Sequence, residues 1–214
     1  MKIVVTVGMP GSGKSSHPKK FGEKYGYPLL ETHTPLYEEL KKRELGATIE
    51  NIKKVTKELK KISDSYLTEK LMEIVKTRFK DKKLVFLSGL RSPSEIELLN
   101  KEFGEENVYV IAFVASRISR YTRHAHPKKG FDFVGKSSRE EEKELKEKMK
   151  EDRLMVDFKE FIKKEEKDLG WGQGDVIALA EYYIVTESER YPKRSFEESH
   201  KDFEEMIKEI LREK

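Results

Sequence analysis

The chain has 214 residues, of which 36% are hydrophobic and 39% are charged, and its 44 Lys and Arg residues nearly balance 40 Asp and Glu. The net charge of +4 is too small to indicate a polyanionic partner, and the lack of cysteine excludes disulfides, thiolate metal sites and a cysteine nucleophile. No stretch approaches the ~20 consecutive apolar residues of a membrane span, and the apolar N-terminus is too short for a signal peptide. We therefore expect a cytoplasmic protein with no membrane partner. Its Lys- and Glu-rich composition is typical of the surface ion-pair networks of thermophiles.

The first predicted strand leads into a glycine-rich loop. The β-branched run Ile3–Val7 predicts a buried strand, and Gly8–Ser15 fits the pattern G-x-x-x-x-G-K-S/T of a phosphate-binding loop, or P-loop. We expect Lys14 to reach the β- and γ-phosphates of ATP and the Ser15 hydroxyl to ligate Mg²⁺. A helix should follow, regular only after Pro18. The predicted nucleotide-binding residues of this segment are Gly8, Pro10, Gly11, Ser12, Gly13, Lys14, Ser15 and Ser16.

Strands and helices alternate after the loop. β-branched and aromatic runs predict strands, and apolar residues spaced three and four apart predict helices between them. Up to residue 114 we predict strands at 27–31, 84–88 and 108–114, and helices at 35–43, 48–62, 67–79 and 93–103. Thr48 is a typical N-cap residue for its helix. Strands with helical crossovers predict a three-layer α/β/α fold, with a parallel sheet that binds its ligand at the C-terminal ends of the strands.

From Ser116 the sequence becomes strongly basic. Arg117, Arg120 and Arg123 share one side of a predicted helix, where they either clamp a transferring phosphate or form a solvated basic face. A capping box at Ser138 then precedes a helix that is nearly all charged, which is typical of an exposed element. We expect a single domain, residues 1–214, in which 117–152 form a mobile lid.

The C-terminal part returns to the α/β pattern. We predict a helix from Asp157, a glycine-rich turn at 169–175, a buried helix at 176–180, a strand at 183–186 and a closing helix from Ser195. Trp171, between two glycines, either packs beneath the lid or belongs to the core, and the core position is favoured.

Three segments carry a resemblance to an archaeal family of P-loop kinases related to dephospho-CoA kinase and the nucleoside-monophosphate kinases. They are Gly8–Ser15, the turn Gly89–Ser92, and Leu169–Tyr182, which resembles the family's Gly-Trp-Gly-x-Gly signature. The resemblance extends over nearly the whole chain. It implies a five-stranded parallel sheet of order 2-3-1-4-5, a site for ATP and Mg²⁺ at the P-loop, an arginine-bearing lid, and adenine close to Thr186.

Three positions depart from the pattern of that family. The relatives carry Gly-Asp where this chain has His33–Thr34, Arg where it has Tyr37, and Asp where it has Ser88. The two acids are the expected ligands of Mg²⁺-bound water and the expected base for the acceptor hydroxyl. Glu31 and Glu165 are the nearest carboxylates that could replace them, and Glu165 lies where relatives have Asp.

Two classes of function remain open. The first is a kinase that transfers the γ-phosphate of ATP to a small-molecule or nucleotide acceptor. Its candidate catalytic residues are Lys14, Arg91, Arg120 and Glu165, with Arg117 and Thr186 at the nucleotide. Arg91 is as compatible with a local salt bridge as with a substrate contact. The second class is a nucleotide-binding protein with weakened or redirected catalysis, such as an ATPase, a regulator or an RNA-acting protein, although the near-neutral charge disfavours RNA.

Overall fold

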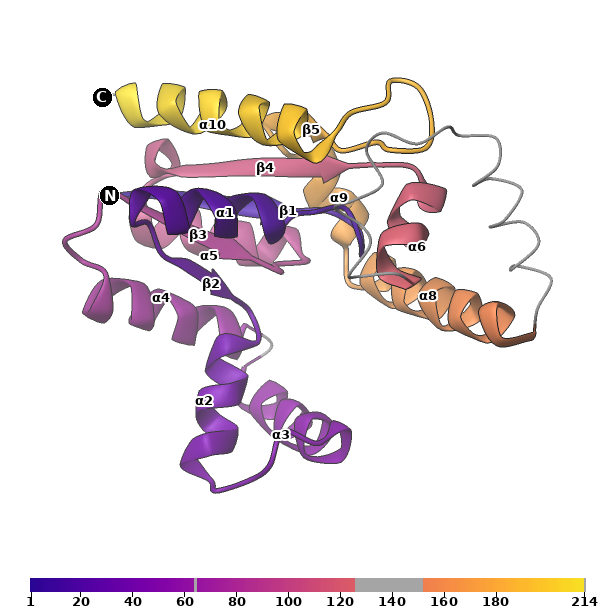
Figure 1. Cartoon of the computed structure of the whole chain (residues 1–214). Coiled ribbons are helices and arrows are strands. Elements are labelled where there is room, and N and C mark those ends of the chain that lie inside the picture. Colours follow the sequence, from indigo (N-terminus) through magenta and orange to yellow (C-terminus); the bar gives the residue numbers. More distant parts are fainter. Residues whose placement is uncertain (64, 126–151, 214) are drawn as a thin grey trace.

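The computed structural model describes residues 1–63, 65–125 and 152–213 (Figure 1). The predicted capping box at Ser138 and most of the predicted lid therefore lie outside the described residues. Within the described part of the chain, no helix combines the length and the apolar character needed to cross a membrane.

Five parallel strands form the central sheet. They are β1 (Lys2–Val7), β2 (Leu29–Glu31), β3 (Leu84–Ser88), β4 (Val108–Val114) and β5 (Tyr182–Val185). Their order is β2-β3-β1-β4-β5, which confirms the order implied by the family resemblance. Because β1 is central, its Ile3 pairs with Val85 of β3 and with Val108 of β4. The C-terminal ends of the strands consequently meet at one edge of the sheet, where the P-loop begins.

Helices connect the strands and cover both faces of the sheet. They are α1 (Ser16–Tyr25), α2 (Thr34–Lys42), α3 (Ile49–Ile62), α4 (Tyr66–Arg78), α5 (Pro93–Phe103), the 3₁₀ helix η1 (Glu105–Asn107), α6 (Arg117–Ala125), α8 (Asp152–Gly170), α9 (Gln173–Ala178) and α10 (Phe196–Arg212). Helices α6 and α8 lie beyond the C-terminal ends of the strands, on the side of the molecule toward which β4 points (Figure 1).

The two faces of the sheet have separate hydrophobic cores, because successive side chains of a strand point to opposite faces. Val5 of β1 packs with residues of α4, α5 and α9, among them Leu71 and Leu99. Val4 faces the other way and packs with Phe21 of α1 and Phe203 of α10. Burial on both faces explains why the strands read as continuous apolar runs.

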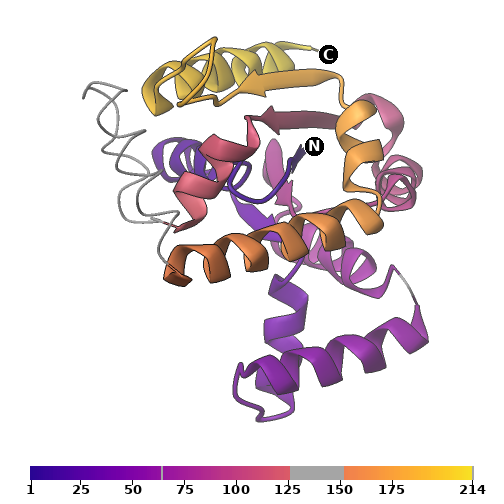
Figure 2. The same ribbon diagram turned by 90° about the vertical axis from the view of Figure 1, so that its right-hand side faces the viewer.

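Helices α2 and α3 form an arm that extends away from the sheet in both views (Figures 1 and 2). The arm has a small core of its own, in which Leu36 and Leu40 of α2 pack against Val55 and Leu59 of α3. As predicted, Thr48 caps α3: its hydroxyl accepts a hydrogen bond of 3.2 Å from the amide of Asn51. The arm is therefore held together by apolar contacts of its own.

Three predicted helix starts were wrong. Helix α1 begins at Ser16, before Pro18, since the amides of the first turn have no acceptor within the helix and proline costs no hydrogen bond there. The described part of helix α8 already begins at Asp152 rather than at 157, and helix α9 begins at Gln173 rather than at 176. The predicted strand at 108–114 was correct at both ends.

Candidate active site

The P-loop curls tightly because its glycines adopt conformations that other residues rarely reach. Gly8, Gly11 and Gly13 have φ angles of 151°, 79° and 91°. A Cβ atom on Gly8 would lie 2.6 Å from the carbonyl oxygen of Phe113 in β4, and one on Gly11 would overlap the carbonyl group of Arg120 in α6. The loop therefore packs directly against β4 and α6, and only glycine fits at both contacts.

Lys14 projects a cation into this site without a paired carboxylate. Its ammonium group has no hydrogen bond or ion pair with any residue that the structure describes. Burial lowers its pKa from 10.5 to about 8, and the negative charge of Asp168 only partly offsets this effect. A buried cation without a close anion is stabilised by binding phosphate oxygens, so Lys14 is suited to its predicted role.

Ser15 stands beside two other oxygen-bearing side chains. Its hydroxyl donates a hydrogen bond of 2.8 Å to Oε1 of Glu31 and lies 3.0 Å from the hydroxyl of Ser88. Strand pairing brings these side chains together, because Glu31 at the end of β2 is paired with Ser88 at the end of β3. The other carboxylate oxygen of Glu31 lies 3.2 Å from Nε2 of His33.

This group of oxygens has the chemistry that Mg²⁺ requires. Magnesium binds few protein oxygens and retains waters or phosphate oxygens for its remaining positions. Ser15 and Glu31 would supply a hydroxyl and a carboxylate. The hydroxyl of Thr34 is used elsewhere, since it accepts a hydrogen bond from the amide of Glu31. The side chains present therefore fit a magnesium ion, with the carboxylate coming from the end of β2.

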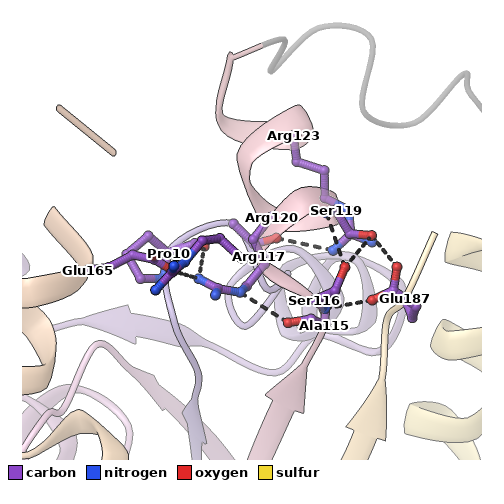
Figure 3. A network of polar contacts seen from close by, with 10 residues as sticks. Pro10, Ala115, Ser116, Arg117, Ser119, Arg120, Arg123, Glu165 and Glu187 are labelled. Atoms are coloured by element: carbon purple, nitrogen blue, oxygen red, sulfur yellow. Dashed lines mark hydrogen bonds and ion pairs between the residues drawn. The ribbon is translucent and has the colours of Figure 1, made fainter. Parts of the chain in front are cut away.

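Arg117 and Arg120 of α6 both pair with Glu165 of α8 (Figure 3). Nε of Arg117 lies 2.8 Å from Oε2 of Glu165, and Arg120 binds the other carboxylate oxygen. Arg120 and Glu165 are buried, whereas the Arg117 side chain is 59% exposed. Arg120 also donates to the carbonyl of Pro10, at 3.4 Å. This arrangement links α8, α6 and the P-loop through one ionic network.

Arg123 extends the network toward the end of β5. It donates to the carbonyl of Gly11 at 3.1 Å and to the carbonyl of Thr186. The hydroxyl of Thr186 in turn donates to the carbonyl of Ser12 at 2.8 Å. Burial lowers the pKa of Arg123. The interpretation of these arginines as a solvated basic face is therefore wrong for Arg120 and Arg123, and their predicted contact with phosphate stays a prediction.

Glu187, next to Thr186, fixes the start of α6. It accepts hydrogen bonds from the hydroxyl of Ser119 and, at 2.6 Å, from the amide of Ser116 (Figure 3). Burial tends to raise the pKa of Glu187, but these hydrogen bonds and one from the amide of Arg190 outweigh it and lower the pKa to about 2. The carboxylate thus stays ionised and holds α6 against the end of β5.

Arg91 and Asp168 form the other side of the site. Nε of Arg91 lies 3.2 Å from Oδ1 of the buried Asp168, and the guanidinium carbon lies 4.8 Å from the centre of the Trp171 ring. The side chain of Arg91 is thus in a local salt bridge. Trp171 is 37% exposed, so the prediction of a core aromatic was wrong. Both charges of the Arg91–Asp168 pair influence the pKa of Lys14, which places the pair near the P-loop.

The structure brings together most of the predicted site residues at the C-terminal edge of the sheet. Sequence reasoning missed Asp168. The sequence contained a signal for it, because Glu165 and Asp168 are three positions apart and so share a face of α8. That face meets α6 through Glu165 and the turn after β3 through Asp168.

The fold and the loop define the chain as a P-loop protein with a kinase-like fold, and comparisons with known proteins agree. A family model described as an AAA domain matches residues 7–119. A UPF0200 protein of Pyrococcus abyssi is 30% identical over 210 residues, which cover 98% of this chain and 97% of the relative. A UPF0200 protein of Thermococcus kodakarensis is also 30% identical, over 98% of both chains.

Among solved structures, shikimate kinase from Bacteroides thetaiotaomicron matches with a TM-score of 0.51 and 16% identity, over 97% of this chain and 98% of that chain. At this identity the match shows the fold alone. The sequence relatives show more: the chain belongs to the UPF0200 family, whose matched members come from archaea. The resemblance to an archaeal family with a P-loop kinase fold is confirmed.

Proposed function

We propose that this protein is an ATP-dependent phosphotransferase in which Glu31 supplies the carboxylate that the relatives' aspartates supply. One observation carries the proposal. The hydroxyl of Ser15, the P-loop residue expected to ligate Mg²⁺, lies 2.8 Å from Oε1 of Glu31. Glu165, the other carboxylate considered, is neutralised by two arginines and is less available to a metal ion.

The side chains around the P-loop suit phosphoryl transfer. Lys14 would bind the β- and γ-phosphates, and the amides of the glycine-rich loop would bind their oxygens. Mg²⁺ held by Ser15 and Glu31 would neutralise charge that develops on the phosphates. An acceptor oxygen forms a bond to the γ-phosphorus as the bond to the ADP oxygen breaks, and the acceptor proton leaves to a base. Asp168, a buried carboxylate near Lys14, is our candidate for that base.

A second candidate function is nucleotide binding with weakened catalysis. Ser88 and Thr34 stand where the relatives carry acids, and both hydroxyls are already engaged, with Ser15 and with the amide of Glu31. A hydroxyl can hold a water molecule but supplies no charge. Loss of a general base alone costs ~10²–10⁴-fold in rate. This alternative predicts tight ATP binding with slow turnover.

The test compares Glu31→Gln with Glu38→Gln, a matched change in the exposed part of α2 that should affect only the ion pair with Arg78. Turnover of ATP would be measured with Mg²⁺ and a panel of acceptors that includes nucleoside monophosphates and dephospho-CoA. We expect Glu31→Gln to lower turnover about 100-fold, as for loss of an electrostatic catalytic group, and Glu38→Gln to leave it unchanged.

Unchanged turnover in Glu31→Gln would refute the role given to Glu31. If the unmodified protein binds ATP but turns over slowly with every acceptor, Ser88→Asp combined with Thr34→Asp should raise the rate, which would favour the second function. Lys14→Ala should remove most ATP binding while the protein stays folded, as judged by calorimetry and circular dichroism.

A further inference from the structure

A pocket lies between the α2–α3 arm and the end of α8, outside the P-loop itself. It has a volume of about 450 Å³ and is lined by α3 and by Lys167 and Trp171 at the α8–α9 turn. Pockets that hold small molecules in proteins typically have volumes of ~300–1,000 Å³. The pocket is therefore large enough for a metabolite-sized ligand.

Every charged side chain among the described residues that line the pocket is positive. Lys53, Lys57 and Lys61 recur every fourth residue on α3, so they share one face of the helix, and Lys167 faces them from α8. None of the described residues that line the pocket is acidic. Four ammonium groups in one concavity repel one another and create a positive potential that favours a multiply charged anion.

Some surface lysines of the chain are neutralised by acids. Lys24 pairs with Glu204 at 2.8 Å, and Lys70 pairs with Glu73 at 2.5 Å. None of the four pocket lysines forms an ion pair with a carboxylate among residues 1–63, 65–125 and 152–213. Their charges are thus available to a ligand.

The pocket adjoins the phosphate site through shared side chains. The ammonium of Lys167 lies 4.5 Å from the centre of the Trp171 ring, and Arg91 contacts the same ring at 4.8 Å. Arg91 also pairs with Asp168, and the charges of both residues influence the pKa of Lys14. One end of a ligand in the pocket would therefore lie toward Arg91, the candidate base Asp168 and the phosphate that is transferred.

We propose that this pocket is the acceptor site and that the acceptor is a small molecule carrying at least two negative charges, such as phosphate or carboxylate groups. The inference rests on the proposed phosphotransferase function. Arg91 would contact the end of the acceptor nearest the P-loop, and the α3 lysines would bind the anionic groups farther away.

The chain provides its own reporter, because Trp171 is its single tryptophan and lines the pocket. Inorganic pyrophosphate would be titrated at fixed ionic strength while tryptophan fluorescence is recorded, with the P-loop first filled by a non-hydrolysable ATP analogue. We expect a saturable change in emission. Lys57→Glu should weaken binding of pyrophosphate roughly tenfold, because it reverses a charge inside the pocket.

Lys54→Glu is the matched control. It makes the same change of charge on the same helix, but Lys54 does not line the pocket. It should alter the pyrophosphate affinity less than about twofold, because a charge outside the pocket is screened by solvent. Equal effects of the two variants, no saturable change in emission, or a response to single-stranded RNA alone would each overturn the proposal.

The two proposals fail in different ways. Binding of the ATP analogue to each variant, measured by calorimetry, tests the P-loop independently of the pocket. If the analogue binds and pyrophosphate leaves the emission unchanged, the acceptor pocket is refuted and the proposed function survives. If the analogue does not bind, the proposed function fails, and the same titration on Lys14→Ala decides whether the pocket binds anions by itself.

Discussion

Two groups of cations flank the P-loop, and they differ in what neutralises them. In the closed cluster, Arg117, Arg120 and Arg123, the side chains bind Glu165 or carbonyl groups of the protein. In the open cluster, Lys53, Lys57, Lys61 and Lys167, no described carboxylate pairs with the lysines. Ion pairs and hydrogen bonds within the protein connect its structural elements, whereas charged side chains without a protein partner are available to a ligand. Positive side chains therefore connect structural elements in the closed cluster, and in the open cluster we propose that they bind a ligand.

The largest effect should come from breaking the closed cluster at its acid. Glu165→Ala leaves the buried guanidinium of Arg120 without its carboxylate, and removal of one partner of a buried pair costs ~3–5 kcal/mol. Chemical denaturation would measure the loss of unfolding free energy. Glu166→Ala, the next residue and an exposed one, should change it by less than about 0.5 kcal/mol. Equal values for both variants would show that the closed cluster does not stabilise the fold.

Acid should weaken the attachment of α6, the helix that carries the closed cluster, through Glu187. Its pKa is about 2 when folded and near 4.5 when unfolded, so its stabilisation is present above pH 4.5 and is lost as the pH falls toward 2. Allowing for solvent screening, we expect on the order of 2 kcal/mol.

His17 adds a separate loss. Burial, with smaller effects from His200 and Arg123, lowers the pKa of His17 from 6.5 to about 3. Its contribution to stability therefore declines as the pH falls from 6.5 to 3. The difference between the unfolding curves of the unmodified protein and Glu187→Gln, measured from pH 7 to pH 3, isolates Glu187. A difference that does not change with pH would contradict its assignment.

Between the two clusters, Lys14 should make ATP binding sensitive to alkaline pH. Its pKa of about 8 means that the free protein loses this charge as the pH rises from 7 to 9, where ATP phosphates have already titrated. The affinity for ATP should fall roughly tenfold over this range. Isothermal calorimetry at several pH values would measure it, and Lys14→Gln should bind weakly with no such dependence. A wild-type affinity that stays constant to pH 9 would show that Lys14 is not the titrating group.

The smallest effect is expected from neutralising the open cluster. Lys57→Gln removes repulsion without removing an ion pair, so the free energy of unfolding should stay within about 0.5 kcal/mol of the unmodified value and should not fall. Lys24→Gln, which loses the ion pair with Glu204, should lower the stability instead. Thermal unfolding at low salt would compare the two. A clear loss in Lys57→Gln would show that the pocket lysines have a structural partner.

The features that the sequence by itself determined are local. Strand β4 follows from an unbroken apolar run rich in β-branched and aromatic residues, and the start of α3 follows from the hydroxyl of Thr48. The P-loop was visible because its glycines, Lys14 and Ser15 are adjacent in the chain. The order of the strands was predicted through the family resemblance, since strand pairing is not encoded within any short segment.

Only the tertiary structure decided which charges meet. Glu31 reaches Ser15 across 16 positions of the chain, and Glu165 reaches Arg120 across 45. Of two carboxylates that are equivalent candidates in the sequence, Glu31 lies beside the P-loop and Glu165 is paired with two arginines. Trp171 likewise lies at a pocket and not in the core, because the fold places α3 opposite the α8–α9 turn. Side chains on separate elements interact only where packing brings those elements together, and packing depends on the whole apolar surface of the chain.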